Sequence, residues 1–150
     1  MKTEGTVRVT FVESQSEVPI VKFSRNGREM YGLVDTGSES TLFDDSVVDD
    51  GTIPCVDGMD TEMNLVGMNG STGRRPMRGV SAYVDMDGNR VKVAGLSTDL
   101  SPFSNHLADT YGENLKIDAV FGSDILSWYG AKIDFANREI VLNYDLSGKQ

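Results

Sequence analysis

The stretch that decides the fold is Leu33-Val34-Asp35-Thr36-Gly37-Ser38. Two apolar residues lead into an acid, and the small residues that follow favour an immediate turn of the chain. The stretch therefore predicts a strand that presents the Asp35 carboxylate at its end, with Gly37 leaving room for close approach of another backbone. The same residues also suit an ordinary strand that runs into a turn, because Asp, Gly and Ser favour turns for backbone reasons alone.

In a second stretch, Ala119-Val120-Phe121-Gly122-Ser123-Asp124-Ile125-Leu126, apolar residues lead directly into a glycine. With this stretch, the chain resembles the aspartic proteases. Residues 33–38 are similar to their hydrophobic-hydrophobic-Asp-Thr-Gly-Ser/Ala signature, and residues 119–126 to their later hydrophobic-hydrophobic-Gly element and short helix. The order and separation suit the single-domain, retropepsin-like branch, and the resemblance extends from about Val18 to Tyr144.

The position after Gly122 separates this chain from the viral members that it resembles. Those members usually carry Arg or a similar residue there and pair it with an acid just past the first motif. Ser123 occupies the position here, so a bridge to Glu39 is unavailable. The Gly-Ser-Asp version is more similar to cellular or bacterial retropepsin-like proteins.

The strand and turn patterns predict an all-β chain. Asn26-Gly27 and Asp87-Gly88 are favoured two-residue hairpin turns. Strands are predicted over Thr6–Val12, Val18–Ser24, Arg28–Val34, Thr41–Phe43, Thr61–Met68, Arg74–Val84, Val80–Met86, Arg90–Leu96, Ile117–Phe121, Ala131–Phe135 and Glu139–Tyr144. The resemblance implies that these strands form a retropepsin-like closed β-barrel, the acid protease fold, with a flap hairpin and one short C-terminal helix.

Helical signals are few in the sequence. Ile125–Tyr129 is predicted as a helix that Ser123 or Asp124 caps, and Trp128 is expected to pack it against the sheet. Asp44–Val48 favours a brief helical turn. Thr98–Lys116 is predicted as a long polar connection with one helical turn around Asn105 to Tyr111.

Peptide hydrolysis by water needs one group that takes a proton and another that gives one, and two adjacent carboxylates that share a proton can do both. The chain holds a single Asp-Thr-Gly, and Asp57, Asp99 and Asp109 lack the pattern. The second carboxylate must therefore come from another copy across a two-fold axis, so activity requires a homodimer. Activity at acidic pH is expected, because one of the shared carboxyls must stay protonated.

The resemblance assigns roles to individual residues. Asp35 would bind and activate the water, Thr36 would brace the two motif loops across the dimer, and Gly37 would let the substrate backbone lie close. An extended peptide or protein substrate would pair with strand edges beneath a glycine-rich flap. The residues expected to contact it are Ser38, Val66, Gly67, Met68, Asn69 and Gly70.

Composition limits the remaining classes of function. The 150 residues suit one domain over residues 1–150, and the net charge of −9 excludes a nucleic-acid partner. Cys55 is the single cysteine, and no apolar window is long enough to span a membrane. We expect a soluble protein, cytoplasmic by default and periplasmic or secreted if a leader precedes this chain.

No metal or cofactor is expected. Asp85, Asp87 and Asn89 begin like a calcium loop, but Arg90 and Leu96 stand where that loop needs Gly and Glu. His106 is the only histidine and has no partner groups in a catalytic pattern, which favours a surface position.

Two functions from other classes stay open at this point. One is a catalytically inactive retropepsin-fold module for peptide binding or dimerisation, since a chain can keep the motif without a productive site. The other is phosphotransfer to a strand-end Asp, which would need another Asp at the position of Gly37 and a phosphate loop that the sequence lacks.

Overall fold

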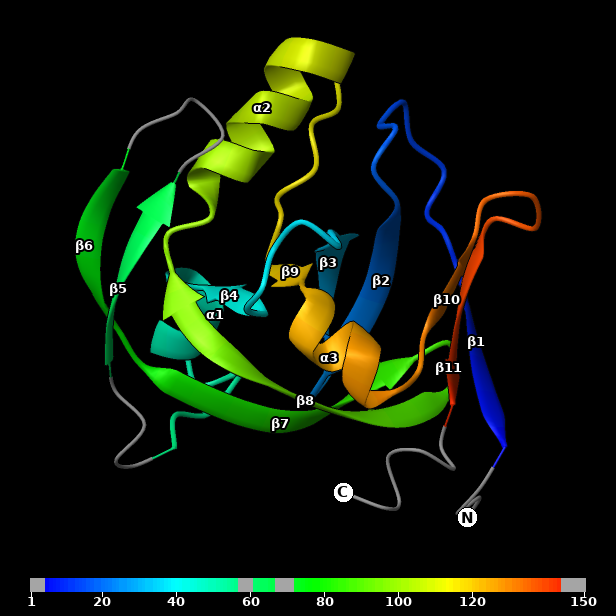
Figure 1. Cartoon of the computed structure of the whole chain (residues 1–150), viewed down its shortest axis with the longest axis horizontal. Coiled ribbons are helices and arrows are strands. Elements are labelled where there is room, and N and C mark those ends of the chain that lie inside the picture. Colours follow the sequence, from blue (N-terminus) through cyan, green and yellow to red (C-terminus); the bar gives the residue numbers. More distant parts are fainter. Residues whose placement is uncertain (1–4, 57–60, 67–71, 144–150) are drawn as a thin grey trace.

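A closed barrel forms the centre of the molecule, with strand order β2-β3-β9-β4-β8-β7 (Figure 1). The structure is a computed structural model that describes residues 5–56, 61–66 and 72–143. The barrel strands are β2 (Ile20–Arg25), β3 (Arg28–Val34), β4 (Leu42–Asp44), β7 (Gly79–Met86), β8 (Asn89–Thr98) and β9 (Ala119–Phe121). The β3–β9 and β4–β8 pairs are parallel and the other pairs antiparallel. The predicted all-β barrel is confirmed.

A second sheet lies beside the barrel and consists of β1 (Thr6–Thr10), β11 (Glu139–Asn143) and β10 (Lys132–Asp134) in that order (Figure 1). Val7 and Val9 are buried on one face of β1, as their alternation predicts. They lie opposite Leu142 and Ile140 of β11, which are buried too. This sheet therefore closes one side of the barrel core.

The hairpin of β5 (Thr61–Val66) and β6 (Thr72–Met77) forms a separate two-stranded sheet at the left of Figure 1. Its antiparallel register runs from the Thr61–Met77 pair to the Val66–Thr72 pair. The predicted hairpin is thus present in its two strands. The predicted substrate contacts Gly67, Met68, Asn69 and Gly70 lie outside the described residues.

Both predicted two-residue turns are confirmed. Asn26 and Gly27 have φ of 53° and 81°, and Asp87 and Gly88 have φ of 50° and 81°. Positive φ at both central residues is what a type I′ hairpin turn requires.

The described residues hold three helices: α1 (Asp45–Asp49), α2 (Ser101–Tyr111) and α3 (Ser123–Trp128). The helical turn predicted around Asn105 to Tyr111 lies within α2. The long polar connection predicted for Thr98–Lys116 is wrong, because α2 begins at Ser101 and occupies most of it. Pro102 lies in the first turn, where proline costs no hydrogen bond, and Gly112 ends the helix at φ 71°.

Tertiary packing explains why α2 forms despite its polar composition. Phe103, Leu107 and Tyr111, spaced by four residues, contact a cluster on the outer side of the barrel. This cluster includes Leu33 and Val120, whereas a larger core fills the barrel interior. The helix therefore covers an apolar patch next to the ends of β3 and β9.

The beginning and the outer face of α3 differ from the prediction. Gly122 is the N-cap residue, and neither Ser123 nor Asp124 caps the helix. Trp128 is 44% exposed and does not pack the helix against the sheet. Leu126 and Tyr129, three residues apart, face inward instead, so the helical period turns Trp128 outward.

A buried polar network joins β4, β9 and the chain that follows α2. Asp44 and Asp118 are 7% and 5% exposed. The Lys116 ammonium lies 2.6 Å from Asp118 Oδ1 and 3.4 Å from Asp44 Oδ2. Asp44 also accepts hydrogen bonds from the Leu100 N–H (2.8 Å) and from the Ser46 hydroxyl and N–H.

None of the helices in the described ranges has the length and apolar character needed to cross a bilayer.

The network predicts a pH-dependent contribution of Asp44 to stability. Burial raises the pKa of Asp44, but the hydrogen bonds from Ser46 and Leu100 and the Lys116 charge outweigh it and hold the pKa below its ordinary value of 3.8. A carboxyl with a lowered folded-state pKa stabilises the fold above its unfolded-state pKa, and this contribution is lost as pH falls through the folded value. Asp44→Asn should therefore cost about 1–3 kcal/mol at neutral pH.

Urea unfolding of wild type and Asp44→Asn at pH 7 and at about pH 3 measures this difference. The difference in the free energy of unfolding between wild type and Asp44→Asn should be smaller at the lower pH. Asp109→Asn, at an exposed position of α2, is the control and should leave stability unchanged. A gap that stays constant between the two pH values would contradict the role of the Asp44 charge.

Candidate active site

Asp35 lies directly after β3, at the point where β3 runs parallel to β9. Its N–H donates to the Phe121 carbonyl at 3.0 Å, which fixes the strand end to the neighbouring strand. The Gly37 N–H donates to Asp35 Oδ1 at 2.9 Å, and the Ser38 N–H donates to the Asp35 carbonyl at 3.1 Å. The turn thus holds the half-buried carboxylate in one orientation.

Residues 35–41 lead from β3 to β4, and β9 lies between these two strands in the barrel. The loop must therefore cross the end of β9, where Gly122 follows the strand. A Cβ atom on Gly122 would lie 2.5 Å from the Ser38 carbonyl oxygen and 2.8 Å from that of Ser40. Only glycine fits beneath this crossing, and the Ser123 N–H closes it with a 2.7 Å bond to the Ser38 carbonyl.

A second set of bonds holds the far end of the loop. The buried Thr41 hydroxyl donates to Asp124 Oδ1 at 2.7 Å and accepts from the Gly122 N–H at 3.1 Å. The Thr41 N–H donates to Asp124 Oδ2 at 3.0 Å, and the Ile125 N–H donates to Asp124 Oδ1 at 2.7 Å. Asp124 therefore joins the first motif to the second instead of capping α3.

The predicted motif residues Asp35, Thr36, Gly37 and Ser38 share this loop. Thr36 and Gly37 are exposed. The Ser38 hydroxyl donates to the Ser40 carbonyl at 2.7 Å, so it stabilises the loop. Val66 is the last residue of β5.

Sequence reasoning missed two residues that hold the site together, Thr41 and Asp124. Asp124 follows Gly122 by two residues, and that spacing is the only signal that the sequence offers for it. Thr41 carries no local signal, because its partners are distant in the chain.

Groups of three or more His, Cys, Asp or Glu side chains arranged to hold a metal ion are absent from the described part of the chain. Asp35 presents its carboxylate on a turn whose Thr36 and Gly37 are exposed.

The barrel, the strand-end Asp35 loop and its crossing over β9 define a retropepsin-like fold. The crystal structure of the retroviral protease-like domain of Ddi1 from Leishmania major has a similar fold, with a TM-score of 0.52. The match covers 83% of this chain and 92% of that chain at 14% sequence identity, so the likeness concerns the fold alone. No protein-family model matches the sequence. No curated protein matches it either.

The Thr41 hydroxyl is predicted to be essential for the stability of the loop. Thr41→Val keeps the shape but removes a donor to Asp124 and an acceptor for Gly122, which leaves buried polar groups unpaired. The expected loss is about 1–3 kcal/mol in the free energy of unfolding. Thr41→Ser keeps the hydroxyl and is the matched control. Urea unfolding that ranks the serine variant no more stable than the valine variant would contradict the assignment.

Proposed function

We propose that this chain is an aspartic endopeptidase that acts as a homodimer. The observation that carries the proposal is the Asp35 carboxylate at the end of β3, oriented by the Gly37 N–H in an Asp-Thr-Gly turn. This turn stands on a retropepsin-like fold, and its Thr36 and Gly37 are exposed for contact with a partner or a substrate.

Hydrolysis needs a pair of carboxyl groups around one water molecule. One carboxylate takes a proton from the water while the other, still protonated, gives a proton to the departing amide nitrogen. Two carboxyl groups that flank a single water molecule share one proton and titrate as a unit, which is the established behaviour of aspartic proteases. We therefore propose activity at acidic pH.

A two-fold axis next to the Asp35 loop would supply the second carboxylate. Each copy would contribute one Asp35, and the exposed Thr36 of each copy would contact the loop of the other. The two loops are suited to such a junction because each is held within its own copy by the Thr41–Asp124 bonds. The dimer would then need no rearrangement of either loop.

The substrate in this proposal is an extended peptide. The β5–β6 hairpin stands apart from the barrel and would cover the peptide as a flap (Figure 1). Gly37 would leave space for the peptide backbone next to Asp35. Extended main chains bind strand edges through backbone hydrogen bonds, and side-chain pockets then determine which sequence is cut.

Cleavage of a peptide library between about pH 3 and pH 8 tests the catalytic role of Asp35. Asp35→Asn should reduce the rate by roughly 10²–10⁴-fold or more, because it removes the proton acceptor from both halves of the pair. Asp109→Asn, on the exposed face of α2, should cleave at the wild-type rate. Equal cleavage by wild type and Asp35→Asn, or none by either, would favour the inactive peptide-binding module.

Mixing wild type with Asp35→Asn tests the need for two copies. If both carboxyls of a pair are required, equal amounts of the two proteins should lose about half of the wild-type activity after the subunits exchange. Asp109→Asn mixed in the same way should not lower it. Activity that is unchanged by the Asp35→Asn protein, together with a monomeric mass in sedimentation, would contradict the shared site.

A further inference from the structure

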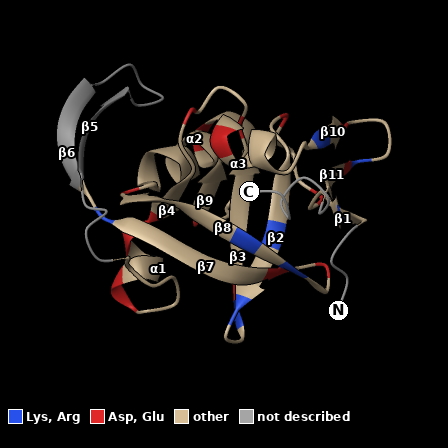
Figure 2. Cartoon of the chain, turned by 60° about the horizontal axis from the view of Figure 1, so that its bottom comes forward, with Lys and Arg blue, Asp and Glu red and all other residues tan. Residues whose placement is uncertain are grey.

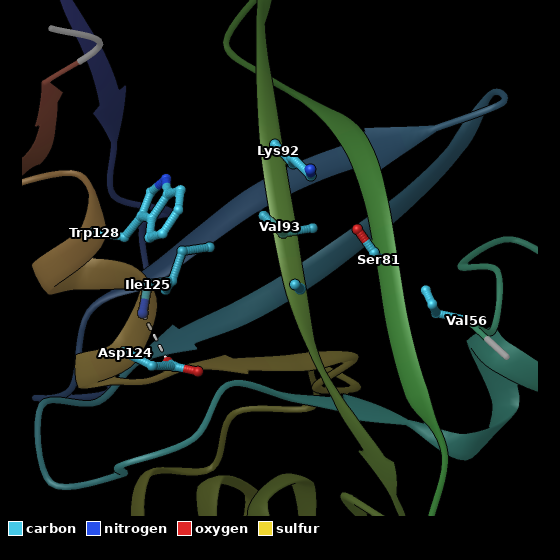
Figure 3. Close-up of a pocket in the computed structure, with 8 residues that line it drawn as sticks. Val56, Ser81, Lys92, Val93, Asp124, Ile125 and Trp128 are labelled. Atoms are coloured by element: carbon cyan, nitrogen blue, oxygen red, sulfur yellow. Dashed lines mark hydrogen bonds between the residues drawn. The ribbon is translucent and has the colours of Figure 1, made fainter. Parts of the chain in front are cut away.

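A groove of about 420 Å³ lies on the outer side of the barrel, between α3 and the β7–β8 pair (Figure 3). Ile125 and Trp128 of α3 line one wall, and Ser81 and Lys92 line the other, with Val56 at its far side. This volume lies in the range of sites that hold small ligands or a few peptide residues. Asp35 is not among the residues that line it.

The backbone of β8 has a free edge along this groove. The Lys92 N–H and C=O point away from β7 and both bond to the Tyr129 hydroxyl. The N–H donates to this hydroxyl at 3.1 Å, and the hydroxyl donates to the Lys92 carbonyl at 2.7 Å. Leu96, four residues on, turns its N–H to the Thr41 carbonyl at 3.0 Å. Alternate residues of a strand point the same way, so Ala94 presents its N–H and C=O to the same edge.

The pairing of β7 agrees with this orientation. Ser81 lies opposite Ala94 and turns its own N–H away from β8 to the Pro54 carbonyl. In the described part of the chain, no strand pairs with Ala94 on the groove side. An exposed strand edge of this kind can accept one more extended chain.

The groove carries apolar walls and opposite charges at its two ends. Trp128 is 44% exposed here and is one of few large apolar side chains that the described residues leave so open. Asp124, at one end, has both carboxylate oxygens occupied by Thr41 and by the Ile125 N–H. The Lys92 ammonium, at the other end, makes no ion pair with the described residues (Figure 3).

We propose that this groove docks an extended segment of a partner protein in which acidic and apolar residues alternate. Its backbone would bond to Ala94 as a short added strand. An aliphatic side chain would lie between Ile125 and Trp128, and a carboxylate would pair with Lys92. Asp35 does not line this surface, although Asp124 at its end also bonds to Thr41 at the far end of the Asp35 loop. Docking at this surface does not depend on the proposed catalysis.

Trp128 is the only tryptophan of the chain, so its fluorescence reports on the groove directly. The probe is a synthetic nine-residue peptide that alternates glutamate and valine, titrated into Asp35→Asn protein so that no cleavage intervenes. A saturable blue shift is expected as Trp128 loses water. The same peptide with lysine in place of glutamate should bind at least about tenfold more weakly.

Two kinds of change test separately the contribution of the Lys92 charge and that of the backbone bonds at the edge of β8. Lys92→Glu should reverse the preference between the two peptides, whereas Lys132→Glu, at an exposed position on β10, should not. Figure 2 shows the basic residues of β8 and β10 in blue. Methylating the backbone nitrogens that face the edge of β8 should lower the affinity of the glutamate peptide by about tenfold, because the bonds to Ala94 are lost.

Three results would overturn the proposal. They are the absence of a saturable shift, equal binding of both peptides, and an equal effect of Lys92→Glu and Lys132→Glu. A shift that depends on protein concentration without peptide would assign the groove to a second copy, and an equal shift with hexanoate would assign it to small carboxylates. Either of these last two outcomes would contradict the proposed partner, an extended acidic and apolar segment.

Discussion

The crossing of residues 35–41 over the end of β9 is the constraint on which the rest of the structure depends. Strand β9 lies between β3 and β4, so the chain that joins these two strands has to pass over Gly122. Contact between the two backbones leaves no space for a side chain there. The exposed turn that carries Asp35 is a direct result of this crossing, because the chain must leave the sheet before it can return.

Bonds at both ends of the crossing keep it in place. The Asp35 N–H bonds to the Phe121 carbonyl at one end, and Thr41 bonds to Asp124 at the start of α3 at the other. At the last residue of β4, the Asp44 N–H donates to the Asp118 carbonyl at 2.8 Å. The Lys116 ammonium contacts the carboxylates of both Asp44 and Asp118. Two buried carboxylates, bridged by the half-exposed Lys116, thus hold β4 next to the start of β9. A carboxylate on a loop with so little freedom is pre-organised, which lowers the cost of orienting it for chemistry.

The sequence predicts those parts of the fold that depend on short-range patterns. Alternation placed Val7 and Val9 on the buried face, and Asn26-Gly27 set a hairpin, because each effect acts within a few residues. Only one turn of helix α2 was predicted, because the stability of the helix comes from the apolar patch that it covers and not from its own residues. Thr41 was missed for the same reason, since its partner Asp124 lies 83 positions away in the chain.

The pairing of β1 with β11 places Thr6 opposite Asn143, so the two ends of the described chain lie side by side (Figure 1). A short linker would be enough to join them. The Asn137 turn between β10 and β11 is exposed and far from the Asp35 loop along the chain. Circularly permuted forms that join these described ends and open at this turn should therefore keep the barrel, because permutation is tolerated where the joined ends are adjacent and the new ends lie in an exposed turn.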